Sequence, residues 1–142
     1  MKRLRCIIRD QDGVAAIESA FALPVLIVML WMFVQLAQMY CALAGIQQAL
    51  GEGARYATVC LNPTAAGCSI PTATQIQTRI TNNVYRIGTG GTFTVTTPVK
   101  GTAGSSSYYD LTVNYSQPTN LLLFPGPTIS LTRFKRVWVA GS

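Results

Sequence analysis

The sequence predicts an α+β fold. One long N-terminal helix crosses a membrane and extends into a small domain made of one short helix and a three-stranded or larger antiparallel sheet. Three observations predict this arrangement. An uncharged apolar run follows a basic N-terminus, a helical apolar pattern continues beyond that run, and the last third of the chain alternates polar and apolar residues. We expect a basic leader over residues 1–13, a transmembrane helix over 14–40 and an α+β domain over 41–142.

The transmembrane prediction depends on the length of the uncharged stretch and on how few polar residues it contains. No charged side chain occurs from residue 19 to residue 51, and residues 20–34 are almost continuously apolar. Crossing the hydrocarbon core takes about 20 apolar residues in a helix. Glutamines then soften the pattern, and Tyr40 suits the membrane interface. The alternative, a core helix of a soluble protein, fits this length and purity poorly.

The charges give the orientation. The chain has 142 residues and a net charge of +6, and four of its eleven basic residues lie in the first nine positions: Lys2, Arg3, Arg5 and Arg9. Lysine and arginine next to a span stay on the cytoplasmic side. We therefore expect a single pass through a bacterial inner membrane, with the C-terminal domain in the periplasm. A basic head does not favour nucleic-acid binding, which needs a basic surface.

The cysteines agree with export. Cys60 and Cys68 bracket a short polar loop, and an oxidising compartment would pair them as a disulfide. Zinc is the competing interpretation, but the chain has no histidine, and two cysteines do not complete a tetrahedral site. We interpret Cys6 and Cys41 as unpaired.

The helical pattern continues beyond the span and predicts one helix over about residues 14–58. An apolar set at helical spacing consists of Leu43, Ile46, Leu50, Ala54 and Ala57. A second set, of small residues every four positions, consists of Gly45, Ala49 and Gly53. Small residues let another helix approach closely. That helix belongs either to another subunit or to the chain's own domain, and the pattern leaves both alternatives open.

The remaining elements follow from periodicity. Isoleucines and a valine at spacings of three and four predict an amphipathic helix over residues 73–87, with Thr72 or Thr74 as its N-cap. Three alternating segments then predict strands at 92–99, 107–116 and 128–140. A flexible polar connection separates the first two strands, and a longer apolar excursion separates the last two.

No pattern in the chain indicates catalysis. Without histidine there is no serine-type triad, and Glu52 and Asp110, the only acids after the span, lie on different elements. The GTGG segment at 88–91 has no helix after it, so it is a turn and not a phosphate cradle. Arg133, Lys135 and Arg136 fit a solvated edge strand. We expect no enzyme activity, no metal and no cofactor.

The opening of the apolar run, DGVAAIESAFALP (residues 12–24), carries one carboxylate, Glu18, five positions after Gly13. A basic head, a glycine, small apolar residues, Ile17-Glu18 and an early Pro24 follow in that order. This order resembles the class III signal peptide of type IV pilin-like proteins. More closely, it resembles the start of the TadE-like family of the tight-adherence (Tad, or Flp) pilus.

The resemblance covers about residues 10–45, and the ARYA segment (54–57) and the sheet-forming tail also suit that family. Ser19 stands where the major pilin has an aromatic residue, which favours a minor pilin or pseudopilin. The family implies that a prepilin peptidase cuts between Gly13 and Val14. It also implies that the product works with other pilin subunits and the pilus assembly machinery.

Cleavage would give the acid a partner. A new α-amino group at Val14, with an ordinary pKa near 8, would lie one helical turn from Glu18. A carboxylate inside a span needs a partner, which is this amine or a neighbouring subunit's amine. The alternative is that Glu18 lies at the cytoplasmic edge and reaches headgroup water.

Two other classes of protein remain open. One is an uncleaved, membrane-anchored periplasmic assembly factor or binding module. The other is a secreted protein cut before Gly45 by an ordinary signal peptidase, since Ala42 and Ala44 form an A-x-A arrangement. The apolar run is longer than the h-region of a signal peptide, which argues against the secreted form.

Overall fold

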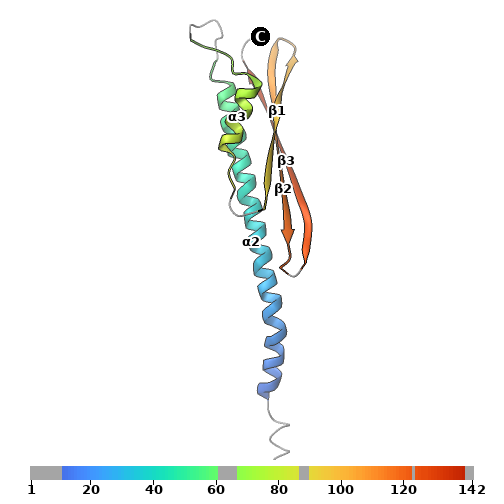
Figure 1. Cartoon of the computed structure of the whole chain (residues 1–142). Helices are drawn as coiled ribbons and strands as arrows, with labels where there is room; N and C mark the ends of the chain where they lie inside the picture. The colour runs from blue at the N-terminus through green and yellow to red at the C-terminus, as the bar shows by residue number, and fades with distance from the viewer. Residues whose placement is uncertain (1–10, 61–66, 87–89, 123, 140–142) are drawn as a thin grey trace, which may run out of the picture.

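The computed structural model describes residues 11–60, 67–86, 90–122 and 124–139. Its elements are α2 (Gln11–Ala57), α3 (Ala73–Asn83), β1 (Thr92–Ala103), β2 (Ser106–Asn120) and β3 (Pro125–Val139). Figure 1 shows α2 as a long rod, with α3 and the sheet beside its C-terminal part and its N-terminal part projecting alone. The predicted α+β class, with a long N-terminal helix, a short helix and a three-stranded antiparallel sheet, is confirmed.

The long helix matches its prediction closely. It begins three residues before the expected start, ends one residue before the expected end, and continues through Pro24. Every residue from Gly13 to Ile27 is exposed. Among the described residues, α2 is the helix long and apolar enough to cross a membrane. Apart from Glu18 and Ser19, the side chains of this part are apolar on every side of the helix, as expected of a helix surrounded by lipid.

The short helix begins where a capping box places it. The Thr72 hydroxyl accepts a hydrogen bond from the Gln75 amide, and the Gln75 side chain accepts one from the Thr72 amide. This reciprocal pair satisfies two N–H groups at the helix start. The helix ends at Asn83, earlier than the predicted residue 87, because Val84 is already extended.

The sheet is an antiparallel meander in the order β1-β2-β3, and both of its hairpins are longer than predicted. Gly104, at φ 62°, turns the first hairpin within the segment predicted as a flexible connection. The second hairpin continues to the Asn120–Pro125 pair, through the segment predicted as an excursion. The strands accommodate the prolines of this segment, because Pro118 lies at a register irregularity and Pro125 and Pro127 lie on edge strand β3, where proline is tolerated.

The core lies between α2, α3 and one face of the sheet. Ile76 and Ile80 of α3 and Leu111 and Val113 of β2 are fully buried in it. The Tyr115 ring packs 4.7 Å from the Phe93 ring, centroid to centroid. This core surrounds only the C-terminal part of α2, so the domain holds the helix at one end and leaves the other end free.

Candidate processing site and helix-packing face

The bond between Gly13 and Val14 lies in the first turn of α2. The first four N–H groups of a helix have no partner within it, so this turn is the easiest one to unwind. A Cβ at Gly13 would meet no atom within 4 Å. The fold of this chain therefore places no steric demand for glycine at position 13.

Glu18 lies one turn after Val14, and residues four apart share a helix face. Its side chain is exposed. The ion pairs in the described part of the chain are Glu52–Arg55 and Asp110–Arg136, and neither involves Glu18. The neighbouring Ser19 hydroxyl donates to the Ala16 carbonyl at 3.0 Å, within the helix. The acid is therefore free to meet a group from outside the described domain.

The small-residue face meets the chain's own domain. A Cβ at Gly45 would lie 2.2 Å from the carbonyl oxygen of Tyr85, and one at Gly53 would lie 2.4 Å from the Ile80 side chain. Ala49 between them is fully buried. Of the two alternatives for Gly45, Ala49 and Gly53, the structure therefore selects packing on the chain's own α3 and the segment after it. The folded domain leaves no room there for a second subunit.

The two patterns seen in this part of the sequence are one buried face. The residues of α2 buried after Tyr40 recur at alternating steps of three and one: Ala42, Gly45, Ile46, Ala49, Leu50, Gly53, Ala54 and Ala57. Gln47, Gln48 and Arg55 are exposed on the other side. A cut before Gly45, as the secreted alternative requires, would divide this continuous face.

Cys60 and Cys68 form a disulfide, with their Cα atoms 5.4 Å apart. Cys60 is buried just after the end of α2, so the bridge fixes the exit of the long helix beside the segment that leads into α3. Cys41 is a free thiol. Cys6 lies outside the described residues.

Sequence reasoning missed a contact between α2 and the second hairpin. The Trp31 indole N–H donates to the Asn120 carbonyl oxygen at 2.9 Å. The Gln35 side chain donates to the same oxygen and accepts from the Asn120 amide at 3.0 Å. We call these hydrogen bonds the Asn120 clasp. The only signal in the sequence was Gln35 itself, a polar residue in an otherwise apolar run.

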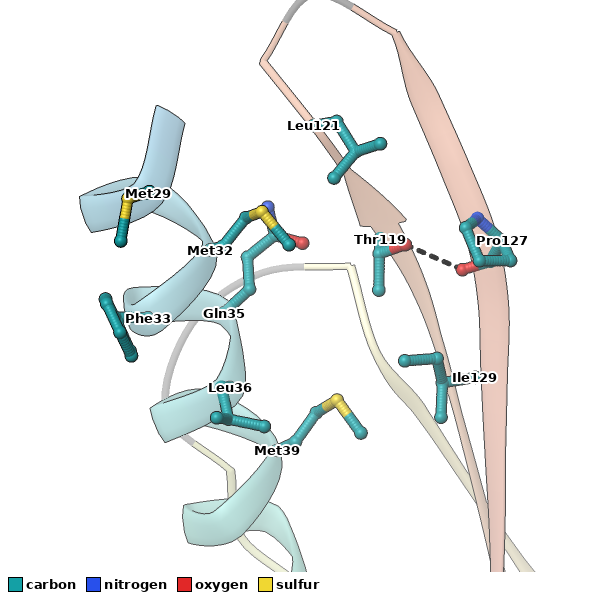
Figure 2. A pocket seen from close by; sticks show the side chains of 10 residues that line it. All are labelled: Met29, Met32, Phe33, Gln35, Leu36, Met39, Thr119, Leu121, Pro127 and Ile129. Atoms are coloured by element: carbon teal, nitrogen blue, oxygen red, sulfur yellow. Dashed lines mark hydrogen bonds between the residues drawn. The ribbon is translucent and has the colours of Figure 1, made fainter. Parts of the chain in front are cut away.

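Beside the clasp lies a groove of about 450 Å³ between α2 and the hairpin, and Gln35 is part of its lining. Figure 2 shows Met32, Leu36 and Met39 pointing from α2 toward the hairpin, across from Leu121 and Ile129. No charged side chain lines this groove. Three of the four methionines in the chain do: Met29, Met32 and Met39.

The hairpin tip is a tight turn. The Leu121 amide donates to the Phe124 carbonyl at 2.9 Å, and the Leu122 amide donates to the Asn120 side chain at 3.1 Å. Leu122 has φ 69°, in the left-handed region, which costs a residue with a side chain about 1–2 kcal/mol. Glycine would avoid this cost, so the turn itself does not explain a leucine at this position.

The outer face of the sheet carries an aromatic group around one ion pair. Arg136 makes two hydrogen bonds to Asp110, at 2.7 and 2.9 Å, and stacks 4.0 Å from the centre of the Tyr108 ring. Trp138 packs edge-on against the same ring. The hydrogen bond from Arg136 holds the pKa of the Asp110 carboxyl below its ordinary value, and the same contact raises the pKa of Arg136. In the described segments, no three His, Cys, Asp or Glu side chains lie together as metal ligands would.

Comparison with protein families adds one finding. Residues 13–55 match the family model of the TadE-like proteins. The match begins at Gly13 and ends two residues before the end of α2, while α3 and the sheet lie outside it. It confirms the resemblance seen in the sequence and suggests a protein associated with the tight-adherence pilus. The length and apolar composition of α2 are consistent with a single-pass membrane anchor. No curated protein and no solved structure matches the chain.

Proposed function

We propose that the chain is a minor pilin or pseudopilin that takes part in assembly of a tight-adherence (Flp-type) pilus and has no catalytic activity of its own. One observation carries the proposal. The family match starts at Gly13, in the first turn of a helix whose next fourteen residues are all exposed, away from the domain. The helix end that a peptidase and neighbouring subunits would recognise is thus fully accessible.

The geometry suits cleavage between Gly13 and Val14 by a prepilin peptidase. A protease needs an extended backbone at the bond that it cuts, and the bond between Gly13 and Val14 lies near the start of α2, so few residues of this helix would have to unwind. Because the space around Gly13 is open, a requirement for glycine at this position would come from another molecule and not from the fold of this chain. The leader, residues 1–13, would leave on the cytoplasmic side, where its lysine and arginine residues hold it.

Cleavage would create a charged pair at the new N-terminus. The α-amino group of Val14 has an ordinary pKa of about 7.7–8.0 and would be positive at neutral pH. Glu18 lies one turn away, on the same face of the helix. Glu18 would pair with this amine or with the amine of a neighbouring subunit.

The exposed half of α2 supplies the surface for other subunits. The disulfide is consistent with a domain in the periplasm, because such bridges persist in oxidising compartments. Since the domain covers Gly45, Ala49 and Gly53, contacts between subunits are expected to use the half before Tyr40. The partners would be the inner membrane, the prepilin peptidase, other pilin or pseudopilin subunits and the assembly machinery.

The test is the N-terminal residue of the full chain recovered from membranes of cells with and without a prepilin peptidase. A start at Val14 only when the peptidase is present supports the proposal. Gly13→Leu should block processing, whereas Gly51→Ala, at a second open glycine of the same helix, should leave it intact. A start at Met1 in all samples would overturn processing and leave the anchored assembly factor. A start at Gly45 would show a secreted domain.

A second variant assigns the role of the acid. If Glu18→Gln is processed but fails to enter pili, the carboxylate serves a step after cleavage, as the pairing with the amine requires. If Glu18→Gln remains unprocessed, the peptidase itself recognises the Glu18 carboxylate. Normal processing and normal piliation in Glu18→Gln would contradict the charged pair.

A further inference from the structure

The tip of the second hairpin lies beside the membrane-spanning part of α2. Counted from Ser19, the first residue after the acid, about 20 residues of span reach Gln38. The Asn120 clasp joins the hairpin to Trp31 and Gln35, inside that length. Figure 1 shows β2 and β3 continuing past the lower end of β1, so that their hairpin lies beside the middle of α2.

The composition of the hairpin suits a non-aqueous setting. Between Asp110 and Arg133 the chain has no charged side chain over 22 residues. At the tip, the side chain of Leu122 is 49% exposed and that of Phe124 is 69% exposed. Neither residue belongs to the buried core. Leu122 keeps a large apolar side chain at a backbone conformation that favours glycine. An apolar side chain held at this position is explained by an apolar surrounding.

Several backbone groups of the tip already have hydrogen-bond partners within the protein. In lipid, each backbone N–H and C=O group needs a partner within the protein. At the tip, Gln35 and Trp31 bind the Asn120 backbone, and the amides of Leu121 and Leu122 have partners within the turn. Prolines at 118, 125 and 127 have no N–H to satisfy.

The groove behind the tip has the same character. Its lining is uncharged, and it contains three methionines, whose flexible thioether side chains adapt to an occupant without a fixed shape. The groove lies between the hairpin and the part of α2 from Met29 to Met39, which is within the expected span (Figure 2). The chemistry that fits an uncharged, adaptable groove at this depth is a lipid acyl chain.

We propose that the β2–β3 hairpin tip is immersed in the outer leaflet of the inner membrane as a second membrane contact, and that acyl chains fill the groove between the hairpin and α2. This inference rests on the proposed membrane anchor. Two contacts, the span and the tip, would fix the rotation of α2 about its own axis and the tilt of the domain on the membrane. A single helix leaves both of these free.

The experiment measures depth with nitroxide labels on the full chain, reconstituted in liposomes at low protein content. Cysteine replaces one residue at a time in a Cys6→Ser, Cys41→Ser background that keeps the disulfide. The sites are Phe124→Cys at the tip, Val25→Cys in the span and Ser105→Cys in the turn between β1 and β2. Oxygen, which concentrates in lipid, and a nickel chelate, which stays in water, broaden the label signal by collision.

Immersion predicts that labels at 124 and 25 collide more with oxygen than with nickel, and that the label at 105 does the reverse. Leu122→Cys gives a second reading of the tip, and circular dichroism confirms that each labelled chain is folded. Nickel access at both 122 and 124, with 25 still in lipid, would overturn the inference and leave the anchor standing. Protection of the tip from both reagents would also overturn it, in favour of cover by a second protein. Nickel access at 25 would instead refute the membrane anchor.

Discussion

The two halves of α2 are both apolar but are built for different surroundings. From Gly13 to Ile27 every residue is exposed, and large side chains such as Phe21 and Leu26 point in all directions. After Tyr40 the helix has one buried face, made mostly of alanine and glycine, and a polar face opposite. One helix therefore has a half suited to lipid and a half suited to a protein core with water behind it.

The difference shows that residue size and arrangement carry information that mean hydropathy does not. A helix in lipid does not need its apolar residues confined to one side, because its surroundings are apolar on every side. A helix packed on its own domain needs small residues where other elements approach, as Tyr85 does at Gly45 and Ile80 does at Gly53. The same difference predicts how substitutions in the two halves should behave.

The largest expected effect is on the core that covers the second half. Ile80 of α3 is fully buried, and its side chain packs on Gly53 of α2. Ile80→Ala should therefore lower the free energy of unfolding of the domain by about 2–5 kcal/mol. The measurement is guanidinium unfolding of the full chain in detergent, followed through the signal of the sheet.

Leu26→Ala is the matched control, because it removes a large aliphatic side chain from the same protein in the exposed half. It should leave the unfolding of the domain unchanged. If both variants destabilise the domain equally, the two halves are not independent and the comparison fails.

The next effect concerns the glycines of α2. Gly45→Ala places a Cβ 2.2 Å from a backbone oxygen, so the segment at Tyr85 must move, at a cost of about 1–3 kcal/mol. Gly51→Ala meets no atom within 4 Å and should stabilise the helix by about 0.5–1 kcal/mol. Thermal unfolding of the two variants should therefore shift in opposite directions. Shifts of the same sign would show that Tyr85 does not pack on Gly45.

A smaller effect is expected at the boundary between the halves. Gln35→Leu removes both hydrogen bonds to the Asn120 backbone and should cost about 0.5–1.5 kcal/mol. Hydrogen exchange at the Asn120 amide should become faster. Gln38→Leu is the control, since the clasp does not include Gln38. Unchanged exchange in Gln35→Leu would mean that the hairpin does not depend on the clasp.

The sequence predicted the parts of this fold that depend on periodicity. The long helix, its extension into the domain, the capping threonine and the three strands each follow from a local pattern, and the structure confirms them. The transmembrane span over residues 14–40 stays a prediction, for which α2 is long and apolar enough. The processing site at Gly13, Val14 and Glu18 stays a prediction, because its partner is another molecule. Which element packs on the face of Gly45, Ala49 and Gly53 could not be predicted. The spacing of small residues shows that a neighbour comes close, but it does not show which element this neighbour belongs to.

The hairpin shows why the remaining features escaped prediction. An apolar excursion was expected between the last two strands, yet most of this segment is in strands, because a register irregularity and an edge position accommodate its prolines. The clasp between Gln35 and Asn120 joins residues 85 positions apart, and no local pattern encodes such a distance. Long-range contacts between single polar residues need the three-dimensional arrangement.

The smallest predicted effect compares the acids of the two regions. Glu18 has no basic partner among the described residues, whereas Asp110 in the sheet is held by Arg136 at 2.7 Å. This contact keeps the pKa of Asp110 below its ordinary value of 3.8. A carboxyl whose pKa is lowered by folding stabilises the folded state above its unfolded pKa, and that contribution is lost as the pH falls through the folded value.

The stability difference between the native chain and Arg136→Gln should therefore be constant from neutral pH down to about pH 5 and should shrink as the pH falls below about 4. The measurement is thermal unfolding of both chains over this range, with the Asp110 titration followed by nuclear magnetic resonance. In Arg136→Gln the pKa of Asp110 should rise toward 3.8. Since the pair lies on the exposed outer face, high salt should weaken the difference. A difference that is independent of both pH and salt would assign the role of Arg136 to its stacking on Tyr108 and not to its charge.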